Sequence, residues 1–191
     1  MTKIIIIHGL GGHPKENWFS WLKQELEKLN YVVEVPQLPS PYQPQLKEWL
    51  STLEKLKITP EDILIGHSLG TPTTLKFLET HKARAAYLIG GFCSLLDERF
   101  NPSIKNFVEN GFEWKKIKNN CQKFIIFHGD DDPFVPLRKG EEVAKNLGVK
   151  VTVIKNGGHL NEEAKYFKFP QLLEKIKEEF KREKQSREKS S

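Results

Sequence analysis

The sequence is poor in cysteine, in long apolar runs and in blocks of a single charge. Cys93 and Cys121 are its only cysteines, and their spacing fits neither a metal site nor the disulfide framework of a small secreted domain. Near the start, four isoleucines at residues 4–7 follow a single lysine, and this run is too short for a secretory leader or a membrane span. We therefore expect a cytoplasmic protein with reduced thiols and no membrane association.

The charge balance is basic but mixed. Lysine and arginine together number 30 against 25 aspartates and glutamates, which gives a formal net charge of +5. Lysines and glutamates are interspersed at residues 23–28 and 174–179, as on solvated helix faces. Because no basic block alternates with aromatic side chains, we expect no nucleic-acid partner.

Short apolar runs alternate with amphipathic stretches of helical periodicity along the 191 residues. The strands are expected at residues 4–7, 31–35, 63–65, 85–89, 124–127 and 149–154. Such alternation produces parallel strands covered by helices on both faces. It predicts an α/β fold, a three-layer α/β/α sandwich whose mostly parallel sheet has about six strands.

The length suits one domain, which we place at residues 1–182. Within it, residues 92–120 are the least regular and predict a helical excursion near the site, with one or two short helices. A last helix is expected at about 170–182. Residues 183–191 contain no apolar side chain and predict a polar, disordered tail.

The strongest chemical signal is the turn Gly66-His67-Ser68-Leu69-Gly70, which matches Gly-x-Ser-x-Gly between a strand-like and a helix-like run. The serine of such a turn has a strained backbone, and side chains two positions away would collide with the strand or the helix. Ser68 is therefore the candidate nucleophile, at the carboxyl edge of the sheet where ligands bind in such folds.

A serine hydroxyl needs a base to take its proton, and in this fold an acid and then a histidine follow the serine along the chain. Three histidines lie downstream of Ser68. His81 falls near the end of a helix and His128 closes a strand, so we expect both to be structural. His159 follows Gly157-Gly158 after the last strand and is the candidate base.

The candidate acid lies among Asp130, Asp131 and Asp132, which cannot all face one histidine. Asp132 stands directly before Pro133, in the register typical of the acid loop of this fold, and is our choice to orient His159. Asp131 is a serious alternative, and Asp130 is expected to be a loop or capping residue. The cluster lacks the alternating ligands and bidentate glutamate of a calcium loop, so we expect no metal.

Acyl transfer also needs donors for the oxyanion. One candidate is the backbone amide of Leu69, directly after the nucleophile. The second is the amide of Leu10, because the glycines of residues 9–12 let this loop approach a substrate closely. The same loop lacks the third glycine of a dinucleotide fingerprint, and no Gly-Lys-Ser/Thr occurs in the chain. We therefore expect no cofactor.

Four stretches carry a resemblance: His67-Ser68-Leu69-Gly70, Asp-Asp-Pro-Phe-Val-Pro at 131–136, Gly157-Gly158-His159, and Phe-Glu-Trp-Lys-Lys-Ile-Lys at 112–118. With them the chain resembles the YdeN-like, or retinoblastoma-binding-protein-nine-like, family of small serine hydrolases. The resemblance spans about residues 1–180 and implies a compact α/β-hydrolase without a long lid, acting on short-chain esters. The spacing from Asp132 to His159 is also what the family pattern implies. The first loop, residues 8–13, departs from that pattern toward the general hydrolase turn.

These residues predict hydrolysis of a small carboxylic ester, thioester or amide through an acyl-serine intermediate, by a monomer or weak dimer. The alternative is a catalytically weak protein of the same fold that acts mainly by binding a protein partner. Aromatic residues between 92 and 120 would supply the exposed apolar patch for that role. They are Phe92, Phe100, Phe107, Phe112 and Trp114. We favour the interpretation in which they are core residues that shape the acyl pocket.

Overall fold

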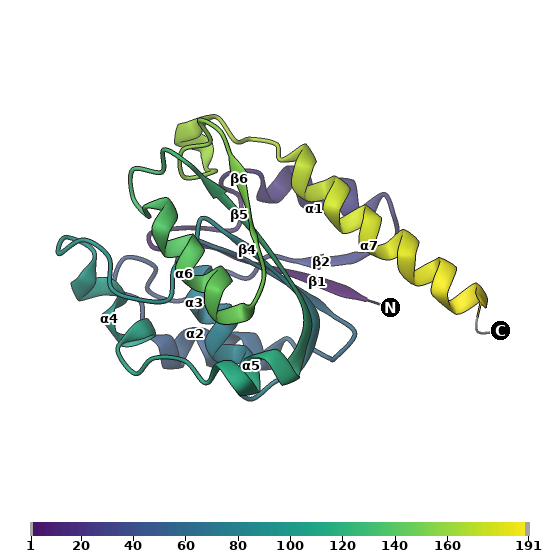
Figure 1. The fold of residues 1–191 in the computed structure, drawn as a ribbon, viewed down its shortest axis with the longest axis horizontal. Coiled ribbons are helices and arrows are strands. Elements are labelled where there is room, and N and C mark those ends of the chain that lie inside the picture. The colour runs from purple at the N-terminus through teal and green to yellow at the C-terminus, as the bar shows by residue number, and fades with distance from the viewer. Residues whose placement is uncertain (1, 190–191) are drawn as a thin grey trace.

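A six-stranded sheet forms the centre of the molecule, and every neighbouring pair of its strands is parallel (Figure 1). The computed structural model describes residues 2–189, and their side chains as far as residue 181. The spatial order is β2-β1-β3-β4-β5-β6. The strands are β1 (Lys3–Ile7), β2 (Val32–Glu34), β3 (Ile63–His67), β4 (Ala83–Ile89), β5 (Cys121–Gly129) and β6 (Val151–Ile154). The predicted α/β/α sandwich with about six parallel strands is confirmed.

Helices cover both faces of this sheet (Figure 1). Helices α1 and α7 pack on one face, and the other α-helices lie on the opposite face. The helices are α1 (Phe19–Glu27), α2 (Leu46–Lys55), α3 (Gly70–Leu78), α4 (Asn101–Val108), α5 (Trp114–Asn120), α6 (Leu137–Leu147) and α7 (Pro170–Lys189), with a short 3₁₀ helix η1 (Glu162–Ala164).

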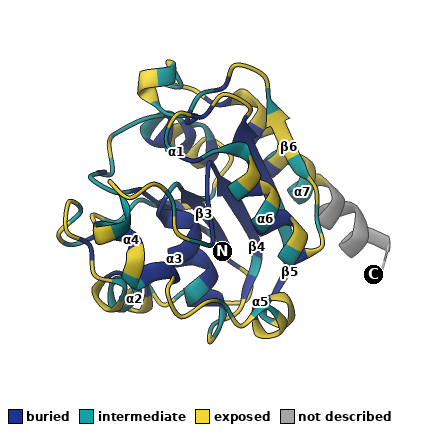
Figure 2. Ribbon diagram, turned by 60° about the vertical axis from the view of Figure 1, so that its left-hand side comes forward, coloured by how far each residue is buried: buried dark blue, intermediate teal, exposed yellow. Residues whose placement is uncertain are grey.

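Helices cover both faces of β1, and this explains why its sequence is a continuous apolar run rather than an alternating one. Ile5 and Ile7 belong to the core under α2 to α6, whereas Ile4 and Ile6 belong to the core under α1 and α7. All four isoleucines are completely buried, because side chains alternate between two faces that are both covered. The central strands are buried in the same way, whereas the edge strand β6 has exposed positions (Figure 2).

Two regions differ in detail from the sequence prediction. Residues 92–120 contain the two short helices α4 and α5, joined to β4 by an irregular loop at the sheet's carboxyl edge. Helix α7 continues to Lys189, beyond the expected end at residue 182, so the expected disordered tail at 183–191 is helical as far as it is described. Residues 183–189 contain two glutamates, two lysines, a glutamine and an arginine, which are good helix formers. Residues 190–191 lie outside the described part.

The topology brings the chemically interesting residues to one edge. His8, Ser68 and Asp130 each follow directly after β1, β3 and β5, and His159 comes a few residues after β6. Since parallel strands all point the same way, these residues meet at the carboxyl edge of the sheet. None of the helices described here is long and apolar enough to cross a lipid bilayer.

Candidate active site

Ser68 sits on a tight turn between β3 and α3. Its φ is +54°, in the left-handed region that costs a residue with a Cβ about 1–2 kcal/mol. The turn is held by a hydrogen bond from the Ser68 amide to the Ile89 carbonyl, 2.9 Å long. A Cβ at Gly66 would collide with the Gly70 carbonyl, and a Cβ at Gly70 with the Ile7 carbonyl. Only glycine fits at these two positions, so both glycines are required for Ser68 to adopt this turn.

The structure brings Asp132 and His159 together. Asp132 Oδ2 lies 2.7 Å from His159 Nδ1, and only 8% of the histidine side chain and none of the aspartate side chain is exposed. Because a carboxylate can only accept, Nδ1 carries the proton and Nε2 is left with a free lone pair. Asp132 Oδ1 accepts from the amides of Phe134 and Val135, each at 2.9 Å. Burial alone would raise the pKa of Asp132, but His159 and these two amides outweigh it and hold that pKa below its ordinary value.

The two neighbouring aspartates hold the main chain of the histidine loop instead of the imidazole. Asp130 Oδ1 accepts from the Asn156 amide and Asp131 Oδ1 from the Gly158 amide, each at 2.7 Å. Three successive carboxylates therefore bond to three points of the loop that ends at His159. Asp131, the alternative candidate acid, bonds to the backbone of Gly158, next to His159. No group of three His, Cys, Asp or Glu side chains among the described residues is arranged to hold a metal ion.

Two residues that the sequence did not single out donate hydrogen bonds to the main chain at His159 and Leu160. His67 Nε2 donates to the His159 carbonyl at 3.0 Å, and Trp18 Nε1 donates to the Leu160 carbonyl at 2.9 Å. Burial, followed by the charge of His159, lowers the pKa of His67 to about 3, so its ring is neutral at ordinary pH. The only available signals were the position of His67 inside the serine turn and the place of Trp18 in an apolar helical stripe.

The remaining histidines have structural positions. His128 is completely buried and donates from Nε2 to the Val135 carbonyl at 2.7 Å, while lying 3.6 Å from Asp132. His81 stacks on Phe77 near the end of α3, with ring centroids 4.2 Å apart. Cys93 and Cys121 are buried and unbridged, and burial raises their pKa values to about 12 and about 11. Neither thiol is an ionised nucleophile near neutral pH.

The loop after β1 is fixed close to Ser68. His8 donates from Nδ1 to the Gly9 carbonyl at 2.9 Å and accepts the Leu38 amide at Nε2 over 3.1 Å. A Cβ at Gly9 would lie 2.9 Å from the Ser68 Cβ, so only glycine allows this approach. The backbone amides of Leu10 and Leu69 donate to no other group among the described residues. Both amides are therefore available to an oxyanion.

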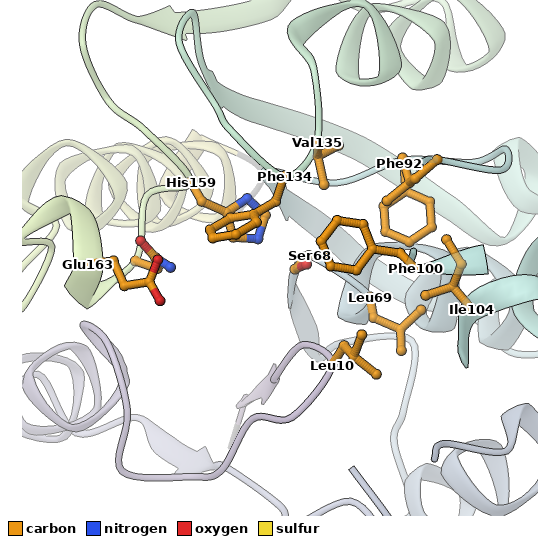
Figure 3. Close-up of a pocket in the computed structure, with 12 residues that line it drawn as sticks. Leu10, Ser68, Leu69, Phe92, Phe100, Ile104, Phe134, Val135, His159 and Glu163 are labelled. Carbon is orange, nitrogen blue, oxygen red and sulfur yellow. The ribbon is translucent and has the colours of Figure 1, made fainter. Parts of the chain in front are cut away.

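A cavity of about 210 Å³ opens beside Ser68, and His159 lines it as well (Figure 3). Its far wall is apolar, with Phe92, Phe100 and Ile104 from the segment that follows β4. Ser68 Oγ makes no hydrogen bond to the imidazole in this structure, although both groups face the same space. Such bonds are often long in the absence of substrate and tighten in the reacting complex.

The aromatic residues between 92 and 120 do not act as one group. Phe92 and Phe100 line the cavity, as predicted. Phe107 instead packs edge-on against Trp49 in the core, with centroids 5.2 Å apart. Phe112 lies beside Trp114 and beneath the Lys76 ammonium, away from the cavity. The prediction that all five shape the pocket is wrong for these three, because Phe107 packs against Trp49, and Phe112 packs against Trp114 and Lys76.

Comparison with known proteins also indicates a serine hydrolase. The family model described as serine hydrolase matches residues 4–178. The chain belongs to the serine hydrolase family. Serine hydrolase RBBP9 of Rattus norvegicus is 31% identical over 162 residues, which make up 83% of this chain and 87% of that protein. YdeN of Bacillus subtilis (strain 168), named as a hydrolase, is 28% identical over 190 residues, 96% of this chain and 99% of that protein.

Solved structures place this serine hydrolase in the same fold. The crystal structure of the ydeN gene product of B. subtilis superposes with a TM-score of 0.88 at 26% identity, covering 95% of this chain and 100% of that chain. Est1E from Butyrivibrio proteoclasticus superposes with a TM-score of 0.72 at 17% identity, covering 97% and 88%. At that lower identity the likeness shows the fold alone. The α/β-hydrolase fold and the resemblance to YdeN-like serine hydrolases are confirmed.

Proposed function

We propose that this serine hydrolase cleaves a small carboxylic ester, or a related thioester or amide, through an acyl-Ser68 intermediate. The observation that carries the proposal is the 2.7 Å bond between His159 Nδ1 and Asp132. It fixes the tautomer in which Nε2 is the basic nitrogen, and Ser68 and His159 line one cavity.

The proposed reaction has two halves. His159 Nε2 takes the Ser68 proton as Oγ attacks the substrate carbonyl, and the amides of Leu10 and Leu69 hold the resulting oxyanion. The imidazolium, stabilised by Asp132, then gives its proton to the departing alcohol, thiol or amine. A water molecule activated by His159 releases the acid from Ser68 and restores the enzyme.

The test is covalent labelling with a fluorophosphonate probe, followed by mass spectrometry of the modified peptide. We expect one label on Ser68, and we expect Ser68→Ala to lower kcat for p-nitrophenyl butyrate by a factor of about 10⁴ or more. A series of p-nitrophenyl esters of increasing chain length would then define the acyl preference. A folded wild-type protein that leaves Ser68 unlabelled and turns over none of these esters would rule out the proposal.

A further inference from the structure

The cleft around Ser68 has a second lobe of different character. A further cavity of about 200 Å³ shares Leu10, Ser68, His159, Asn161 and Glu163 with the first, and the rest of its wall is mostly polar. Its wall includes Glu16 and Asn17 before α1 and Asn161, Glu162 and Glu163 after the base. We call these five residues the acidic lobe. We call the apolar residues of the first cavity the apolar lobe, and Asn161 and Glu163 lie where the two lobes meet. The apolar lobe consists of Phe92, Leu96, Phe100, Ile104, Phe134 and Val135.

The acidic lobe concentrates negative charge without a strong internal cation. Burial is the main cause that raises the pKa of Glu16, and the charge of Glu162 raises it further, against His13 and His159. None of the three glutamates forms an ion pair with a lysine or arginine of the described residues. Glu16 is half-buried, whereas Glu162 and Glu163 are exposed, and carboxylates that have no basic partner attract a cation supplied by a ligand.

The lobe is built from elements that fix each other. The Glu162 amide donates to Asn17 Oδ1 at 2.9 Å, and the Asn17 amide donates to Glu162 Oε2 at 3.3 Å. This pair ties the segment after the base to the segment before α1. His67, only 3% exposed, also lines the lobe. Because its Nε2 donates to His159, its Nδ1 is an acceptor, and that atom has no hydrogen-bond partner in the described structure.

The position of His159 decides which half of a substrate faces which lobe. The leaving group must take its proton from this imidazole, so it lies on the histidine's side of the scissile bond. Asn161, Glu162 and Glu163 come shortly after His159 in the chain. Figure 3 shows Glu163 on the His159 side of Ser68, with Phe92, Phe100 and Ile104 on the opposite side. The apolar lobe therefore suits the acyl chain, and the acidic lobe suits the leaving group.

From this arrangement we propose that the substrate joins an apolar acyl group to a leaving group that carries an ammonium, such as the ester of an amino alcohol. The inference rests on the proposed function of Ser68. The ammonium lies among Glu16, Glu162 and Glu163 while the ester carbonyl lies between Ser68 Oγ and the amides of Leu10 and Leu69. Water attacks the acyl-serine afterwards, so the products are the carboxylic acid and the protonated amino alcohol.

A matched pair of esters tests the proposal. Butyrylcholine and 3,3-dimethylbutyl butyrate have nearly the same shape and differ by one positive charge on the alcohol. We expect kcat/KM to be at least about tenfold higher for butyrylcholine at low ionic strength, with the ratio falling as salt screens the carboxylates. A third ester, 3,3-dimethylbutyl 4-(trimethylammonio)butyrate, carries the charge on the acyl side and should be the poorest substrate. Equal rates for the first two esters, or preference for the third, would overturn the proposal.

Variants that each remove one carboxylate charge test which glutamates cause the preference for the charged ester. Glu16→Gln and Glu163→Gln should each lower the kcat/KM ratio of butyrylcholine to its neutral analogue by about threefold or more, and the double variant should lower it further. The control is Glu174→Gln, whose exposed carboxylate pairs with Lys177 on α7 outside the cleft, and it should leave the ratio unchanged. A ratio that the lobe variants leave at the wild-type value contradicts the proposal.

The same protein samples distinguish a failure of this inference from a failure of the proposed function on which it rests. Fluorophosphonate labelling of Ser68 and turnover of 3,3-dimethylbutyl butyrate report on the nucleophile alone. If both are present and the charge preference is missing, only the acidic-lobe proposal fails. If both are missing in folded protein, the proposed function fails, and the substrate assignment fails with it.

Discussion

His67 donates a hydrogen bond from Nε2 to the carbonyl oxygen of His159 across 3.0 Å. The residue directly before Ser68 thus holds the main chain of His159, although the two histidines are 92 positions apart in the sequence. Their ring centroids lie 4.9 Å apart. The bond makes His67 one of the side chains that set the distance between Ser68 and His159.

Replacing His67 should therefore reduce catalysis without changing the reacting groups. His67→Ala leaves the His159 carbonyl without its donor, and misplacement of the imidazole should lower kcat by about 10-fold to 100-fold with a smaller change in KM. His67→Gln offers an amide donor at nearly the same reach and should recover most of kcat. Steady-state kinetics with p-nitrophenyl butyrate on both variants provides the measurement. Equal kcat losses in the two variants would contradict a positioning role.

The same histidine makes stability depend on pH. Its pKa is about 3 in the folded protein, mainly because of burial, against an ordinary value of 6.5. Below pH 6.5 the unfolded chain binds a proton at this residue and the folded chain does not, so the free energy of unfolding falls as the pH falls toward 3. Each pH unit in that window removes up to about 1.4 kcal/mol. Burial lowers the pKa values of His8 and His128 too, and their contributions have the same sign.

Urea denaturation between pH 8 and pH 5 measures this dependence. The wild-type free energy of unfolding should be nearly flat above pH 7 and should fall below pH 6.5. In His67→Gln, which cannot take up a proton in this range, the fall should be shallower by about one proton per molecule. If the variant and the wild type show the same slope, then His67 already binds its proton in the folded state, and its assigned pKa is wrong.

The aspartate cluster allows a matched comparison of two neighbouring carboxylates. Asp132→Asn presents an amide to His159 Nδ1 and favours the wrong tautomer, so kcat should fall by a factor of about 10⁴ while the fold is kept. Asp131→Asn retains an oxygen that can accept the Gly158 amide, and we expect less than about a tenfold change in kcat. Hydrolysis of p-nitrophenyl butyrate compares the two. A larger loss in Asp131→Asn would assign the orienting role to Asp131.

Much of this site could be predicted because its signals are local. The glycines around Ser68 and the position of Asp132 before Pro133 each reflect a constraint within a few residues, and parallel strands bring their carboxyl ends to one edge. The contacts from His67 and Trp18 to the histidine loop could not be predicted, because they join positions far apart in the sequence. The direction taken by α4 and α5, which removes Phe107 and Phe112 from the pocket, depends on packing against Trp49 and Lys76. No periodicity in residues 92–120 encodes that packing.

The glycine at the start of α3 offers a test of how tightly the serine turn is built. A Cβ at Gly70 would meet the main-chain carbonyls of Ile7 and His8, which cannot move without disturbing β1. Gly70→Ala should therefore destabilise the fold by about 3 kcal/mol or more and should reduce labelling of Ser68 by the fluorophosphonate probe.

Gly111→Ala is the control for that substitution. Gly111 has a φ of +58°, but no atom lies within 4 Å of the place that an alanine methyl group would take, so alanine there adds backbone strain of about 1 kcal/mol and no collision. Urea denaturation at pH 7.5 compares the two variants, and only Gly70→Ala should also change the labelling rate. A smaller loss of stability in Gly70→Ala than in Gly111→Ala would mean that the β1 and α3 backbones can separate. The close approach of Ser68 to the loop that carries the Leu10 amide would then no longer be a rigid feature of the site.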